Sequence, residues 1–147
     1  MPHPQDIADE FVAEFRHAEY ALKRSGYLRE DKENAEADWD LFAKELGQPF
    51  FDRIMAMGIA TSLIGHPPRR LLSTMLWSPE QPAPLTNVAQ LIINGVCRVR
   101  NSYIHGEKFT GGPEPQWERD ATLVAEARAV LREAISFATT IFPKPAA

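Results

Sequence analysis

Residues 120–141, DATLVAEARAVLREAISFATTI, carry the clearest helical pattern in the chain. Apolar side chains recur there at three- and four-residue steps, which places them on one face of an α-helix. That face consists of Leu123, Val124, Ala127, Val130, Leu131, Ala134, Ile135 and Ala138. Because an apolar face of this width must be covered by other elements, the stretch predicts a core-facing helix, from about Asp120 to Ile141, in a packed domain.

Four further segments show helical spacing or helix boundary signals. A first helix is predicted from about Asp6 to Arg24, a second from a cap at Asn34 to Gly47, and a third from Pro49 to a stop near Gly65. A central helix then runs from a cap at Thr86 to about His105, ending at Gly106 or soon after. Strand-like alternation and repeats are absent. The predicted fold is therefore all-α, an antiparallel bundle of four or five helices.

A proline-rich stretch precedes the central helix. Five of the 12 prolines lie between Gly65 and Leu85, so a long regular helix cannot run there. These are Pro67, Pro68, Pro79, Pro82 and Pro84. The apolar residues from Leu71 to Trp77 predict a short helical turn held against the body of the domain. The stretch is accordingly interpreted as an insertion and not as a domain boundary.

Composition limits the class of protein. A chain of 147 residues with 44% hydrophobic content predicts one globular domain spanning residues 1–147. The formal net charge of −4 excludes the strongly basic surface of a non-specific nucleic-acid binder, so any nucleic-acid site must be local. The single cysteine, Cys97, excludes an internal disulfide and is predicted to be a buried thiol. Without a signal-peptide pattern or a run of about 18 apolar residues, a cytoplasmic protein with no membrane contact is expected.

The central helix has two unlike faces when it is stepped at about 100° per residue. The core side is formed by Val88, Ile92, Val96, Val99 and Tyr103, and the opposite side by Asn87, Asn94, Arg98, Asn101 and His105. The polar side lacks the Glu and Lys residues that usually solvate a surface helix, which indicates contact with a partner or ligand. Arg100 lies on the flank of the core side, so helix geometry alone pairs His105 with Asn101 and Arg98.

Arg100-Asn101-Ser102-Tyr103-Ile104-His105-Gly106 closes this helix with three groups suited to RNA cleavage. A guanidinium holds phosphate charge, an amide orients a reacting group, and an imidazole moves protons near neutral pH. No carboxylate cluster suited to Mg²⁺ accompanies them. The chemistry predicted from these residues needs neither a metal nor another cofactor.

This motif resembles the signature of the HEPN superfamily (higher eukaryotes and prokaryotes nucleotide-binding domains), in which an arginine, usually followed by a polar residue, precedes a histidine near the end of a helix. The resemblance implies an all-α bundle and, as in many members, a metal-independent endoribonuclease of toxin–antitoxin, antiviral or RNA-processing systems. It also implies a homodimer in which two copies of the motif form one cleft. By resemblance, Arg100, Asn101 and His105 are the catalytic residues. The implied partners are RNA, a second copy of the chain, and a cognate antitoxin or regulator.

Several assignments have alternatives. Arg98 is a second candidate for the phosphate contact, and Asn94, Tyr103 and Lys108 are further candidates for RNA contact. The alternative function is a non-catalytic module of the same fold that binds a nucleotide or a partner protein through the polar side of the central helix. Arg100 then covers apolar surface with its stem, and the histidine only favours the helix C-terminus.

Overall fold

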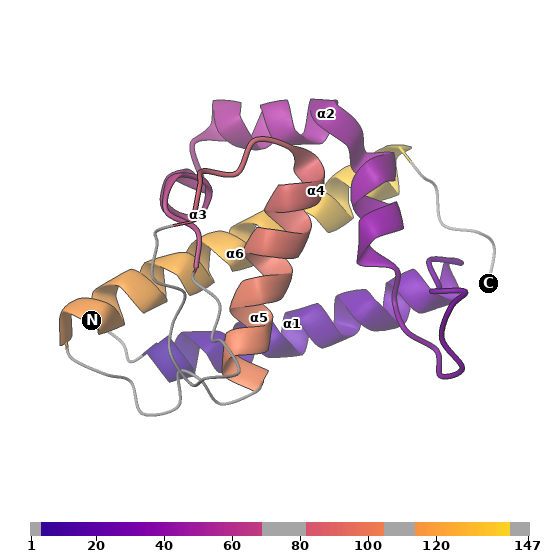
Figure 1. Cartoon of the computed structure of the whole chain (residues 1–147), viewed down its shortest axis with the longest axis horizontal. Coiled ribbons are helices and arrows are strands. Elements are labelled where there is room, and N and C mark those ends of the chain that lie inside the picture. The colour runs from indigo at the N-terminus through magenta and orange to yellow at the C-terminus, as the bar shows by residue number, and fades with distance from the viewer. Residues whose placement is uncertain (1–3, 69–81, 105–113, 142–147) are drawn as a thin grey trace.

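The computed structural model describes residues 4–68, 82–104 and 114–141 (Figure 1). Its helices are α1 (Pro4–Arg24), α2 (Trp39–Met57), α3 (Thr61–Gly65), α4 (Val88–Gln90), η1 (Leu91–Cys97), α5 (Arg98–Ile104) and α6 (Glu114–Ile141). The segments α4, η1 and α5 follow one another without a break and are called the central helix below. Apart from one isolated bridge between Leu28 and Ala37, these residues contain no β-structure, so the all-α prediction is confirmed. Over the same ranges, no helix is both long and apolar enough to cross a membrane.

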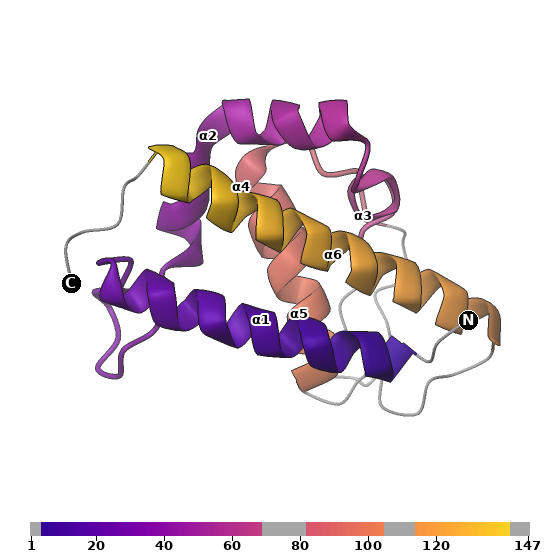
Figure 2. The same ribbon diagram turned by 180° about the vertical axis from the view of Figure 1, so that it is seen from behind.

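Helices α1 and α6 lie side by side, and the central helix crosses them on one side (Figures 1 and 2). Ion pairs between α1 and α6 give their relative direction. Arg128 contacts Glu10 at 3.0 Å, and one turn further along both helices Arg132 contacts Glu14 at 2.6 Å. The two helices therefore run the same way. An antiparallel arrangement is expected of neighbours joined by a short loop, and nearly the whole chain separates these two.

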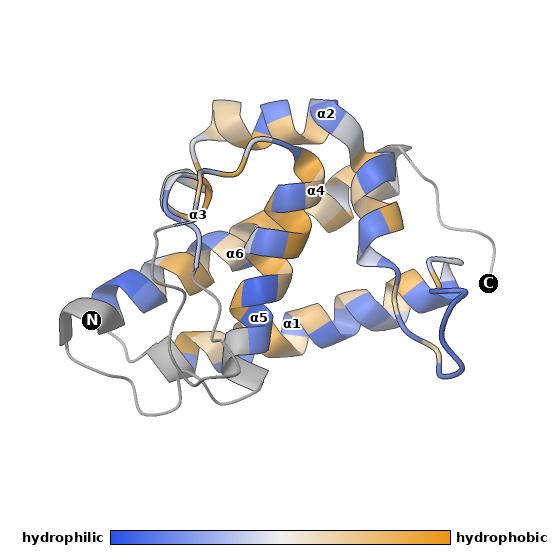
Figure 3. Ribbon diagram, viewed as in Figure 1, coloured by the Kyte–Doolittle hydropathy of each residue, from blue (hydrophilic) through white to orange (hydrophobic). Residues whose placement is uncertain are grey.

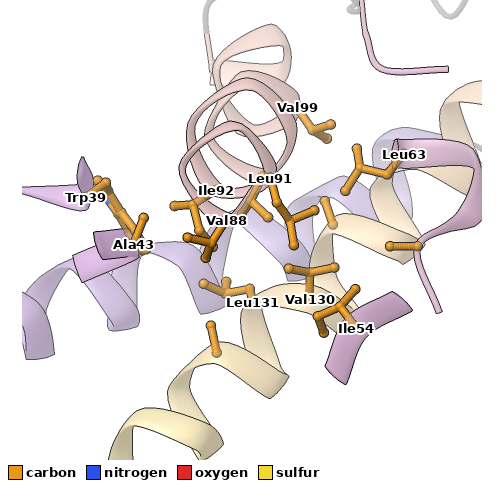
Figure 4. Packing of buried hydrophobic residues seen from close by; sticks show 14 of the residues in the cluster. Trp39, Ala43, Ile54, Leu63, Val88, Leu91, Ile92, Val99, Val130 and Leu131 are labelled. Atoms are coloured by element: carbon orange, nitrogen blue, oxygen red, sulfur yellow. The ribbon is translucent and has the colours of Figure 1, made fainter. Parts of the chain in front are cut away.

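The buried apolar side chains form a continuous cluster between the central helix, α6 and the other helices. Figure 4 shows Val88, Leu91 and Ile92 of the central helix directed toward Val130 and Leu131 of α6. The predicted core face of the last helix is confirmed, because Leu123, Val124, Ala127, Val130, Leu131 and Ala134 are buried. Ile135 and Ala138 are partly buried and pack against the same cluster.

Helix α2 contains the predicted break between the second and third helices. At Gly47 the backbone has φ 73°, which glycine adopts at little cost, and Pro49 starts the second half. The predicted cap at Asn34 is wrong: Asp38 caps the helix, and its Oδ1 accepts the N–H of Leu41 at 3.0 Å. A helix cannot start at residue 34, because the flanking backbone is held extended by the bridge between residues 28 and 37.

Two other helix boundaries differ from the predicted ones. Helix α2 ends at the left-handed Gly58 (φ 66°) and not near Gly65, because this glycine closes the last turn as a C-cap. Helix α6 begins at Glu114, earlier than the expected Asp120. Pro115 does not prevent this, since a proline in the first turn of a helix removes no helical hydrogen bond.

The central helix departs from α-geometry in its middle. The seven residues of η1 form a π-helix, in which N–H groups bond to carbonyls five residues back. Gly95 lies in this segment: a Cβ at that position would be 3.3 Å from Leu85 Cδ1 and 3.4 Å from Leu63 Cγ. Glycine therefore allows these two leucines to pack close to the helix backbone. The predicted core side is confirmed for the four buried residues Val88, Ile92, Val96 and Val99.

The proline-rich stretch is described only at its two ends. The N–H of Leu85 donates to the carbonyl of Ile64 at 2.8 Å, so the chain returns beside the point where it left α3. The helical turn predicted from Leu71 to Trp77 lies outside the described residues. The insertion therefore stays a prediction.

Candidate functional site

A polar stripe runs along the side of the central helix that faces away from α1 and α6 (Figure 3). It consists of Gln90, Asn94, Arg98 and Asn101, all at least partly exposed. Arg98 Nη2 donates to Asn94 Oδ1 at 3.3 Å, as expected for residues four apart on a helix. The structure thus brings together the predicted residues Asn94, Arg98 and Asn101 on one face, and it adds Gln90 to them.

Hydrogen bonds fix the N-terminal end of the stripe. Asn87, and not Thr86 as predicted, caps the central helix: its Oδ1 accepts the N–H of Gln90 at 2.9 Å. The side chain of Gln90 reaches back, and its Oε1 accepts the backbone N–H of Thr86 at 2.8 Å and its hydroxyl at 3.2 Å. This reciprocal arrangement is of the capping-box type and holds the Gln90 amide in one orientation.

An open pocket of about 330 Å³ lies along the stripe. Its polar wall is made by Gln90, Asn94 and Arg98, and its other wall by the chain that leads into the central helix. That second wall consists of Pro67, Pro82, Ala83, Pro84, Leu85 and Thr86. A volume of this size is at the lower end of the range for small-molecule sites.

The side-chain hydrogen bonds give the pocket a donor character. The amide oxygens of Gln90 and Asn94 already accept from Thr86 and Arg98, which leaves their NH₂ groups for a ligand. The described residues that line the pocket include one arginine, and none of them is Asp or Glu. The pocket therefore favours a ligand with acceptor oxygens or negative charge, although the chain as a whole has a formal net charge of −4.

Arg100 lies on the other flank of the central helix, against α1. Its Nη2 donates to Glu19 Oε1 at 3.3 Å, and its Nη1 donates to Asn101 Oδ1 at 3.0 Å. Its Cζ lies 5.0 Å from the centroid of the Phe15 ring, a cation–π contact. Nε is buried and has no hydrogen-bond partner within the described ranges. These contacts hold the guanidinium at the edge of the core with 26% of the side chain exposed.

The two candidate arginines therefore have different surroundings. Arg98 lines the pocket beside Asn94, whereas the charge of Arg100 is compensated by Glu19, with Asn101 beside it. The flank position predicted for Arg100 is confirmed, and its packing over an aromatic ring agrees with the structural interpretation of this residue. Each arginine has an asparagine as a hydrogen-bond partner.

The rest of the motif is not described. His105 and Lys108 lie outside the described residues, and so does the side chain of Tyr103. The predicted pairing of His105 with Asn101 and the RNA contacts assigned to Tyr103 and Lys108 stay predictions.

Cys97 is partly buried, less than the sequence predicts. It packs against the core, and burial raises its pKa from 9.0 to about 12, while the nearby Arg100 lowers it and Glu19 raises it further. The thiol is therefore protonated at neutral pH, unlike a nucleophilic cysteine. Among the residues that the structure describes, no three His, Cys, Asp or Glu side chains come together as metal ligands would.

No protein-family model, curated protein or solved structure matches the chain.

Two residues of the site were missed from the sequence. Gln90 precedes Asn94 and Arg98 at the same four-residue spacing, a signal that would have found it. Glu19 had no such signal, because it is 81 positions away from Arg100 and meets it only through the packing of α1 on the central helix.

Proposed function

We propose that this chain is a metal-independent endoribonuclease of the HEPN type. The observation that carries the proposal is the pair formed by Arg100 and Asn101, whose side chains are hydrogen-bonded at 3.0 Å near the end of the central helix. His105 follows one helical turn later in the sequence. A guanidinium and an amide held together, with a histidine four residues further along the sequence, would supply the donors and the proton acceptor that phosphodiester cleavage needs.

In the proposed reaction, the ribose 2′-oxygen attacks the adjacent phosphorus and the 5′-oxygen of the next nucleotide leaves. His105 accepts the 2′-hydroxyl proton as general base or protonates the leaving oxygen as general acid. Arg100 stabilises the extra negative charge on the phosphorane, and Asn101 orients the scissile group. The products are a 2′,3′-cyclic phosphate and a 5′-hydroxyl.

The rest of the proposal concerns RNA contact and assembly. Arg98 and Asn94, with the pocket beside them, hold RNA next to the cleaved bond, and Tyr103 and Lys108 add contacts at the end of the helix. Two copies of the chain form a homodimer whose motifs share one cleft, so that a second imidazole serves the other proton transfer. The setting is cytoplasmic, in a toxin, defence or RNA-processing system, where a cognate antitoxin or regulator controls the activity.

A second candidate function is a non-catalytic module of the same fold that binds a nucleotide or a partner protein. Two observations favour it. The charge of Arg100 is already paired with Glu19, and the pocket beside Arg98 offers several donors to an anionic ligand. In this alternative, Arg98 holds the ligand and Arg100 stabilises the fold.

Incubation of the purified protein with RNA in excess EDTA, followed by mapping of the fragment ends, tests the proposal. We expect cleavage in chelator with 2′,3′-cyclic phosphate and 5′-hydroxyl ends, and none with His105→Ala at unchanged far-UV circular dichroism. Fragments with 5′-phosphates, or cleavage that requires a divalent metal, would contradict the mechanism. Saturable binding of RNA or a nucleotide without cleavage would favour the second candidate.

A further inference from the structure

We propose that Glu19 is a positioning residue for Arg100 and holds its guanidinium in the orientation in which it meets a phosphate oxygen in the transition state. This inference rests on the proposed function. It assigns a role to a residue of α1, a helix that contributes nothing to the motif in the sequence.

Three contacts fix the guanidinium of Arg100 from different directions. Glu19 accepts from Nη2, Asn101 accepts from Nη1, and Phe15 lies under the cation. A guanidinium has five N–H donors, and each terminal nitrogen carries two of them. Each terminal nitrogen thus keeps a second N–H beyond the contact that fixes it. The guanidinium is oriented and still has N–H donors for a phosphate oxygen.

The α1 side of this arrangement is itself rigid. Phe15 and Glu19 are four residues apart and so occupy the same face of α1. The Phe15 ring is 2% exposed and stacks on Trp39 at a centroid distance of 4.6 Å. Glu19 is shielded as well, with 25% of its side chain exposed. A carboxylate in this place orients the arginine more strongly than a neutral acceptor would, because its hydrogen bonds are charge-assisted.

The charge of Glu19 also has a cost, and this determines which kinetic constant responds. A carboxylate beside Arg100 partly cancels the attraction of the arginine for the RNA backbone before reaction. Preorganisation, in contrast, lowers the barrier, because the oriented donor needs no rearrangement when charge develops. Glu19 should therefore raise kcat without lowering KM. A residue that only maintained the fold would not change kcat and KM differently in a way that depends on Arg100.

The experiment is a double-mutant cycle on RNA cleavage with Glu19→Ala, Arg100→Ala and both together. We expect Glu19→Ala to lower kcat by about tenfold with KM unchanged or lower, a coupling of the size found between residues in direct contact. In the Arg100→Ala background, the same change should have no further effect on kcat. Glu14→Ala is the matched control: Glu14 is on the same helix but pairs with Arg128 and Arg132 of α6, so the change should lower stability and leave kcat alone.

A charge swap, Glu19→Arg with Arg100→Glu, separates positioning from folding. We expect the swapped protein to recover the thermal stability that Glu19→Arg and Arg100→Glu each lose alone, while its kcat stays low. Recovery of kcat by the swap, a wild-type kcat in Glu19→Ala, or an equal loss from Glu19→Ala with and without Arg100 would each overturn the inference.

The proposed function and this inference fail in distinguishable ways. A wild-type protein that neither cleaves RNA nor binds an uncleavable 2′-deoxy analogue would overturn both. Cleavage by the wild type with any of the three contrary results above overturns this inference alone. If the wild type binds RNA without cleaving it, there is no transition state for Arg100 to stabilise, and both the proposed function and this inference are overturned.

Discussion

Replacement of Gly95 by alanine tests the packing inside the central helix. The new Cβ would lie 3.3 Å from Leu85 Cδ1 and 3.4 Å from Leu63 Cγ, so these neighbours would have to shift by a few tenths of an ångström. Leu63 is fully buried and Leu85 nearly so. A close-packed core gives them little space into which to move.

Two opposing effects decide the size of the change. An alanine in place of a helical glycine stabilises by up to about 1 kcal/mol through backbone entropy. Overpacking a core by one methyl group costs about 1–3 kcal/mol. Because the contacts involve two buried leucines at once, we expect a net loss of about 1 kcal/mol for Gly95→Ala and about 3 kcal/mol for Gly95→Val, which adds two more methyl groups. In a chain of 147 residues, each kcal/mol lowers Tm by about 3 °C.

Urea unfolding followed by far-UV circular dichroism measures this loss. Gly65→Ala is the matched control, since Gly65 is also helical but has nothing within 4 Å of an added Cβ. We expect the control to stay within about 0.5 kcal/mol of the wild type. A Gly95→Ala variant as stable as this control would refute the close approach of the two leucines to η1.

Three other predictions concern a cap, a thiol and the two arginines. Asp38→Ala should lower the free energy of unfolding by about 1 kcal/mol and Asn34→Ala should not change it, as measured by urea unfolding, because only Asp38 caps α2. Burial raises the pKa of Cys97 from 9.0 to about 12, so at pH 8 a disulfide reagent should label the folded protein much more slowly than the urea-unfolded chain. Equal labelling rates of the folded and unfolded protein would show that the thiol is accessible. Because the folded pKa lies above the unfolded one, burial of the neutral thiol favours folding below about pH 9, and this stabilisation is lost as the pH rises toward 12. Arg100→Ala should lower kcat for RNA cleavage by about a hundredfold, and Arg98→Ala should lower it less but reduce the salt dependence of RNA binding. A larger kcat loss from Arg98→Ala would transfer the catalytic role to the pocket.

The helices were predictable from the sequence where burial is periodic. Val124 and Leu131 are buried in α6 as their spacing indicates, and the break at Gly47 follows from a glycine and a proline close together. The cap of α2 was not predictable in this way. Asn34 and Asp38 are both good cap residues, and the choice between them depends on backbone pairing that no local pattern shows.

The site was predictable only along one helix. Asn94 and Arg98 could be paired from their spacing, and the flank position of Arg100 followed from helical rotation. The π-helical turn in the same helix was not foreseen, because stepping at 100° per residue assumes uniform α-geometry. The contact of Arg100 with Glu19 depends on tertiary packing, and it changes the interpretation of the motif more than any local feature does.

The parallel pairing of α1 with α6 has a kinetic consequence. The contact of Arg132 with Glu14 joins residues 118 positions apart, so α1 meets α6 only when a loop of that length closes. Closing it costs about 2 kcal/mol more in chain entropy than closing a loop of roughly ten residues. A helical protein that must close this loop should therefore fold more slowly than a bundle with mostly local contacts, and we expect the docking of α1 on α6 to be a late step.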